Sequence, residues 1–157
     1  MTNKWQGNFT QGSFFGANPN NPGGLQLEFV PIKTEDGIMV RAETSVEQKF
    51  EGPPGHVHGG ISSAILDEAM GNVCFKNGYT CVSATQTTDW HRPTPLKTVL
   101  IIEAHIKHVE GKKVSTESKL MLEDGTILVS ATGIYINRPD LFKKFAAALA
   151  GQEERGG

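Results

Sequence analysis

The chain has 157 residues, which is enough for one domain built around a single hydrophobic core. Hydrophobic residues make up 38% and charged residues 20%, as in an ordinary globular protein. The formal net charge is −2, and the 15 basic residues are scattered along the chain. The sequence therefore argues against a partner that is a nucleic acid or a membrane surface, since such proteins normally carry a basic excess.

The cysteines and the ends of the chain bear on its compartment. Cys74 and Cys81 lie in apolar contexts and have neither CxxC nor zinc-type spacing. The N-terminus lacks the apolar run of a signal peptide, and no stretch reaches the roughly 20 apolar residues of a membrane helix. We therefore expect a reduced, cytoplasmic protein.

The first half of the chain predicts two strands and one long helix. Residues 16–24, rich in Gly, Pro and Asn, are expected to form a loop, followed by strands over residues 25–32 and 38–46. After a Pro/Gly-rich loop at residues 52–55, apolar residues recur at three- and four-residue spacing. This spacing predicts a buried helix over about residues 60–76.

The second half predicts four strands and a short helix. The strands are expected at residues 82–91, 99–109, 114–122 and 127–137, and the helix at 141–149. In the first of them, alternation predicts that four polar residues share one face: Ser83, Thr85, Thr87 and Asp89.

The order of these elements predicts an α+β architecture, in which a sheet curls around the long apolar helix to bury it. We expect one domain over residues 1–157. Residues 1–24 would form an N-terminal extension and loop, and residues 150–157 a flexible tail.

Candidate chemistry is concentrated in residues 51–72. His58, Gly59 and Gly60 stand at the start of the predicted helix, where backbone N–H groups lack intrahelical partners and the helix dipole favours negative charge. Glycines also let a substrate carbonyl approach those groups closely. This start is a candidate oxyanion hole. Asp67 places a carboxylate in an otherwise apolar helix, which is costly without a partner or a purpose. Glu68 lies one step round the helix, so the two acids need not share an environment.

The spacing within this helix also predicts an assembly. Asp67 follows Gly59 by eight residues, or roughly 12 Å along a helix axis. One helix cannot bring both groups within about 3 Å of one substrate atom. Two antiparallel copies can, so we expect an active site at a homodimer interface, with a dimer of dimers as the larger alternative.

Three motifs resemble a known family. The first motif is His58-Gly59-Gly60, followed after six residues by Asp67 within LDEAMG. It looks like the signature of hotdog-fold acyl-CoA thioesterases of the PaaI-like and THEM4-like groups. Residues 18–29, NPNNPGGLQLEF, resemble an N-terminal element of the THEM4-like group. Ser83 precedes Pro93 by ten residues, a third match. The resemblance spans about residues 23–137.

This resemblance implies a hotdog fold and hydrolysis of an acyl-CoA thioester, with no cofactor beyond the coenzyme A of the substrate. Asp67 would be the general base or the nucleophile, and Ser83 would position the water or the carboxylate. The backbone N–H of Gly59, with that of Gly60, would polarise the carbonyl, and His58 would fix the loop or contact the substrate.

His56 and Thr85 are further candidates for contact with the substrate. The sequence departs from some relatives at Gly52, where those relatives carry an Asn or Gln donor. His56 is one residue that could replace that donor.

Other interpretations of these residues remain open. Asp67 could be a structural acid that bonds to the Ser63 hydroxyl. A hotdog hydratase or dehydratase would pair His58 with Asp67, and a non-catalytic acyl-CoA-binding module would need neither. We expect no metal, because His56 and His58 have no further ligands at zinc-type spacing. Cys74 is expected to pack in the core. Four basic residues are candidates either for solvated charges or for contacts to phosphates of coenzyme A: Arg92, Lys97, Lys143 and Lys144.

Overall fold

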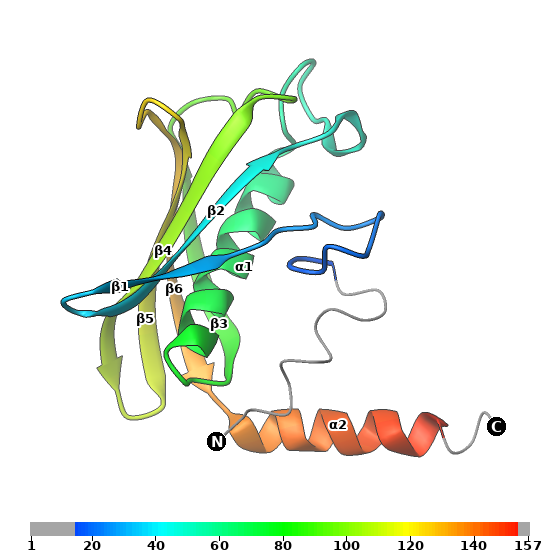
Figure 1. The fold of residues 1–157 in the computed structure, drawn as a ribbon, viewed down its shortest axis with the longest axis vertical. Helices are drawn as coiled ribbons and strands as arrows, with labels where there is room; N and C mark the ends of the chain where they lie inside the picture. Colours follow the sequence, from blue (N-terminus) through cyan, green and yellow to red (C-terminus); the bar gives the residue numbers. More distant parts are fainter. Residues whose placement is uncertain (1–14, 154–157) are drawn as a thin grey trace.

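The computed structural model describes residues 15–153 (Figure 1). In chain order its elements are β1 Val30–Thr34, β2 Gly37–Ser45, the short 3-10 helix η2 Gln48–Phe50, α1 Gly59–Lys76, β3 Cys81–Trp90, β4 Val99–Glu110, β5 Lys113–Leu122, β6 Ile127–Asn137 and α2 Pro139–Glu153. The predicted order of strands and helices is confirmed.

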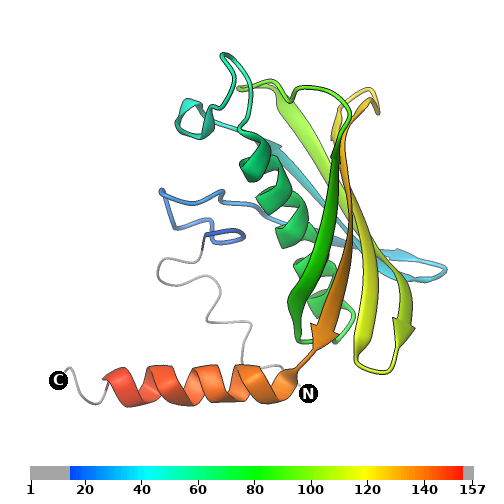
Figure 2. The ribbon, with the colours of Figure 1, turned by 180° about the vertical axis from the view of Figure 1, so that it is seen from behind.

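The strands form one antiparallel sheet in the order β1-β2-β4-β5-β6-β3. The strand that follows α1 therefore crosses to the far side of the sheet, so that β3 becomes an edge strand beside β6. Figure 2 shows α1 lying against one face of this curled sheet. This arrangement is the predicted hotdog fold.

The core lies between α1 and the sheet because the helix is apolar around most of its circumference. Seven residues of α1 are buried: Ser62, Ile65, Leu66, Ala69, Met70, Val73 and Cys74. They share one cluster with inward-facing residues of the sheet such as Leu100 and Ile102. Burying one such aliphatic side chain contributes about 1.5–3 kcal/mol, so this layer dominates the stability of the fold.

The first predicted strand is misplaced. Strand pairing begins at Val30 and not at residue 25. Gln26 has a left-handed φ of 53°, which an extended strand cannot contain. The N–H groups of Leu25 and Leu27 instead donate to the carbonyls of Phe15 and Gly16. Residues 16–24 form turns and bends, as expected of a loop.

The C-terminal helix is longer than predicted. It runs from Pro139 to Glu153, so the expectation of a flexible tail is wrong for residues 150–153, while residues 154–157 and 1–14 lie outside the described residues. Pro139 suits the first helical turn, and the alanines that follow favour continuation of the helix. In Figure 1, α2 extends away from the sheet. Neither α1 nor α2 has the length and apolarity needed to cross a membrane.

Candidate active site

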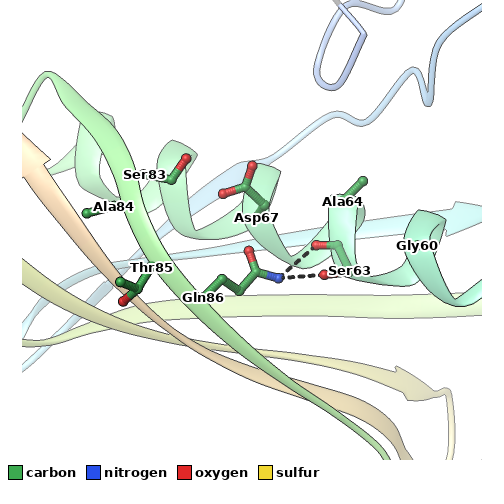
Figure 3. A pocket seen from close by; sticks show the side chains of 8 residues that line it. All are labelled: Gly60, Ser63, Ala64, Asp67, Ser83, Ala84, Thr85 and Gln86. Carbon is green, nitrogen blue, oxygen red and sulfur yellow. Dashed lines mark hydrogen bonds between the residues drawn. The ribbon is translucent and has the colours of Figure 1, made fainter.

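A pocket of about 380 Å³ lies between α1 and the edge strand β3 (Figure 3). Its lining residues come from these two elements: Gly60, Ser63, Ala64, Asp67, Ser83, Ala84, Thr85 and Gln86. The structure therefore brings Asp67 and Ser83, which are 16 residues apart in sequence (83 − 67), to the same pocket. Gly60 and Thr85 also border it.

Asp67 is held by a residue that the sequence analysis did not single out. The hydroxyl of Tyr135, a buried residue of β6, donates a hydrogen bond of 2.5 Å to Asp67 Oδ1 and lies 3.1 Å from the Asp67 backbone carbonyl. Burial, and next the hydrogen bond to Asp67, raise the pKa of the Tyr135 hydroxyl above its usual range. Tyr135 therefore stays protonated and remains a donor to the carboxylate.

Ser83 lies on the helix side of the sheet, just before a β-bulge in β3. Ser83 pairs directly with Tyr135 on β6, and directly opposed residues of antiparallel strands point to the same face. The register then shifts before Thr85, which pairs with Ile134. An extra residue reverses the alternation that follows it. The prediction that Ser83 and Thr85 share a face is therefore wrong, although Thr85 still borders the pocket at the bulge.

The same bulge turns Gln86 toward α1. Its side-chain Nε2 donates to the backbone carbonyl of Ser63 at 3.0 Å, and it lies 2.9 Å from the hydroxyls of both Ser63 and Thr88. The Ser63 hydroxyl also bonds to that of Thr88 at 3.0 Å. Ser63 is thus engaged with β3, and the partner of Asp67 is Tyr135 instead.

His58 is the N-cap of α1. Its Nδ1 accepts a hydrogen bond of 3.0 Å from the backbone N–H of Gly60. The Gly60 N–H is therefore already used, whereas the N–H of Gly59 has no hydrogen-bond acceptor among residues 15–153. Of the two expected oxyanion donors, Gly59 is the available one, at the positive end of the α1 dipole. This bond ties the His58 side chain to the first turn of α1, and its expected role in fixing the loop stays a prediction.

Trp90, at the end of β3, covers the start of α1. Its indole Nε1 donates a 3.2 Å hydrogen bond to the carbonyl of Gly59, although 55% of the residue remains exposed. A Cβ on Gly59 would lie 3.4 Å from the same nitrogen. This aromatic side chain is therefore fixed beside the candidate oxyanion hole.

The missing side-chain donor at Gly52 has a steric explanation. A Cβ at this position would lie 2.7 Å from His58 Cα, so a larger residue does not fit against the loop. His56, the expected substitute, bonds through Nδ1 to the carbonyl of Pro54 at 2.9 Å and does not line the pocket.

Glu68 has a different environment from Asp67, as expected from its place on the helix. Its carboxylate packs against the N-terminal segment, where a Cβ on Gly16 would collide with it. Burial, and next the charge of Asp67, raise the pKa of Glu68 to about 7, against a hydrogen bond from the backbone of Ala17 that lowers it.

The other histidines and Cys74 do not line the pocket. Within residues 15–153, no group of three or more His, Cys, Asp or Glu is arranged to hold a metal ion. His91 contacts the Ser130 hydroxyl at 2.7 Å, and His105 lies 3.3 Å from a carboxylate oxygen of Glu117. Cys74 is buried in the core, as expected of a packing residue.

Sequence reasoning missed Tyr135, Gln86 and Trp90. The one signal for Tyr135 is Gly133, two residues earlier on the same face of β6, where a Cβ would lie 2.6 Å from Tyr135 Cε2. A glycine within a strand often marks a close approach of another group. Gln86 carries no such signal, because the bulge alone decides which way it faces.

Comparisons with known proteins agree with this architecture. The sequence model described as "Thioesterase superfamily" matches residues 54–129. Acyl-coenzyme A thioesterase THEM4 of Xenopus laevis is 34% identical over 91 residues, which cover 55% of this chain and 40% of that protein. The chain thus spans less than half the length of this relative.

Solved structures give the same result. A crystal structure described as a thioesterase superfamily protein aligns with a TM-score of 0.69 and 32% identity, covering 77% of this chain and 61% of that one. A hypothetical thioesterase from Streptococcus pneumoniae, solved with coenzyme A, aligns with a TM-score of 0.62 and 21% identity, covering 69% of this chain and 84% of that one. By sequence match and by fold, this chain is similar to proteins of the thioesterase superfamily, and its fold is the hotdog fold.

Proposed function

We propose that the chain hydrolyses acyl-CoA thioesters, with Asp67 as the group that activates water. The observation that carries this proposal is the pocket between α1 and β3, which contains a carboxylate oriented by Tyr135 and faced by Ser83. A partly buried carboxylate in a pocket, with one fixed hydrogen-bond donor, suits a positioned general base.

The proposed reaction uses three groups. Asp67 takes a proton from a water molecule, whose oxygen attacks the thioester carbonyl carbon, while Ser83 orients the water or the carboxylate. The resulting oxyanion is stabilised by the N–H of Gly59 and the positive end of α1. The C–S bond then breaks, coenzyme A leaves as a thiolate, and the proton passes from Asp67 to that sulfur.

The nature of the leaving group is supported by the relatives. One is named an acyl-coenzyme A thioesterase, and one structure of the same fold was solved with coenzyme A. The substrate contains the coenzyme, so the proposed reaction needs no other cofactor. We also expect a cytoplasmic location, which stays a prediction.

The active unit is proposed to be a homodimer, or a dimer of dimers. Gly59 and Asp67 lie eight residues apart on one helix, about 12 Å along its axis, so they cannot meet at one carbonyl within one chain. β3 supports this assembly, because it is an edge strand that borders the pocket and pairs on one side with β6. An unpaired strand edge is a ready surface for a second copy.

The test is release of free thiol from a panel of acyl-CoA thioesters by the purified chain and by Asp67→Asn. Loss of a general base is expected to lower kcat by about 10²–10⁴-fold with little change in KM. Asp89→Asn is the matched control, because Asp89 is an exposed aspartate on β3. A folded Asp67→Asn variant with wild-type kcat would refute the proposed mechanism.

A further inference from the structure

The hydrogen bond between Tyr135 and Asp67 comes from the buried side of the pocket. Tyr135 is 2% exposed and does not line the pocket itself, yet its hydroxyl lies 2.5 Å from Asp67 Oδ1. One carboxylate oxygen is therefore occupied by a donor from the core. The other is left for the pocket.

We propose that Tyr135 is a positioning residue, which holds the Asp67 carboxylate in one orientation so that its second oxygen faces the attacking water. This role rests on the proposed thioester hydrolysis. Tyr135 does not touch the substrate and acts only through Asp67.

The surroundings of Tyr135 are shaped to hold its ring in this one place. A Cβ on Gly133 would lie 2.6 Å from Tyr135 Cε2, and one on Gly71 of α1 would lie 3.9 Å from Cε1. Gly133 thus leaves room for the ring on β6, close to the contact with the helix. Because Ser83 is the direct cross-strand partner of Tyr135, the β3–β6 pair supplies both polar side chains that flank Asp67.

The donor and acceptor in this contact are well defined. The Tyr135 hydroxyl keeps its proton, since burial and the Asp67 carboxylate both raise its pKa. The other titratable groups whose charges act on Tyr135 are Glu68 and Cys74, and both also raise its pKa. Tyr135 is therefore the donor of this hydrogen bond, and the Asp67 carboxylate is the acceptor.

The hydroxyl affects the rate through the orientation of the Asp67 carboxylate. Misplacement of a reacting group by about 1 Å can cost about 10²-fold. The Tyr135 hydroxyl should therefore accelerate the reaction.

The first test compares Tyr135→Phe with Tyr79→Phe, which changes the other tyrosine of the chain. Tyr79 follows the C-terminal end of α1, more than two helical turns beyond Asp67. We expect Tyr135→Phe to lower kcat about tenfold to a hundredfold at unchanged KM. Tyr79→Phe should change neither kcat nor KM.

A second measurement does not depend on the folding of Tyr135→Phe. In a Tyr79→Phe background, 3-fluorotyrosine labels Tyr135 alone, and its fluorine resonance reports on the hydroxyl. We expect Asp67→Ala to shift this resonance and Asp89→Ala to leave it in place. An unchanged resonance in Asp67→Ala would overturn the proposal.

The outcomes separate the two proposals. A wild-type chain with no activity on any acyl-CoA would overturn the proposed function, and the role of Tyr135 with it. An active chain in which folded Tyr135→Phe keeps the wild-type kcat would overturn the role of Tyr135 alone.

Discussion

Two neighbouring carboxylates on α1 show how strongly position determines chemistry. Asp67 faces the pocket and accepts a hydrogen bond from a buried phenol. Glu68, one residue later, is enclosed by the N-terminal segment, and burial raises its pKa to about 7. A step of about 100° around the helix axis separates these two environments.

Glu68 predicts a pH dependence of stability. Its pKa is about 7 in the folded chain against an ordinary value of 4.5, so between these values the folded state holds a proton that the unfolded state has lost. The contribution of Glu68 to the free energy of unfolding should therefore be greatest below pH 4.5, fall as pH rises, and level off above about pH 7. This shift corresponds to a loss of about 3 kcal/mol.

Substitution of Glu68→Gln should remove this dependence, and should raise the free energy of unfolding at pH 8 with little effect at pH 4. Urea denaturation across this range measures it. Glu110→Gln, at an exposed position on β4, is the control and should keep the wild-type pH dependence. A Glu68→Gln variant that loses stability with rising pH as the wild type does would contradict the assignment to this carboxyl.

At the scale of secondary structure, the start of α1 is the element that carries the proposed oxyanion hole. His58 caps the helix and occupies the Gly60 N–H, which leaves the Gly59 N–H as the donor. Gly59 is the first helical residue, and this position of a helix tolerates proline. His58 has φ −57° and ψ 133°, a conformation compatible with a following proline.

Gly59→Pro therefore deletes one N–H group at a position where the fold should survive. We expect kcat to fall by about 10²–10³-fold, the usual cost of losing one oxyanion donor. Steady-state kinetics measure this change, with circular dichroism to verify the helix. Gly59→Ala keeps the N–H and is the matched control, since a Cβ there makes only an ordinary contact with Trp90. Equal activity of folded Gly59→Pro and Gly59→Ala would exclude Gly59 as the donor.

At the scale of the whole molecule, the question is whether one site uses two chains. Ultracentrifugation should give a species of at least twice the chain mass of 17.0 kDa. Subunit mixing tests the sharing directly, because the Asp67→Asn and Gly59→Pro variants lack different halves of the proposed site.

Co-expressed Asp67→Asn and Gly59→Pro chains should recover activity that neither has alone. Random pairing makes about half of the dimers mixed. If Gly59 and Asp67 of one site come from different chains, each mixed dimer has one intact site and one inactive site. About a quarter of the wild-type number of sites should therefore be active. If both groups came from one chain, mixing would restore nothing. As a calibration of the activity of mixed dimers, each variant is also co-expressed with the wild-type chain in place of the other variant.

The sequence by itself determined the architecture. An apolar helix of about 17 residues between strands can be buried only by a curled sheet, and this reasoning, with the three motifs, predicted the hotdog fold and the family. It also singled out Asp67 and residues 58–60 as candidate site residues. A charge in an apolar helix and glycines at a helix start are local features, which can be read from one stretch of sequence.

Only the tertiary structure decided which residues surround Asp67. Tyr135 is 68 residues away in sequence, and it meets Asp67 because β6 passes beneath α1. The bulge before Thr85 reversed the expected alternation of β3 and turned Gln86 toward the helix, and the left-handed Gln26 moved the first strand to Val30. These features depend on strand register and on backbone conformation at single residues. Both are set by packing between distant segments, so hydrophobic periodicity within one segment does not encode them.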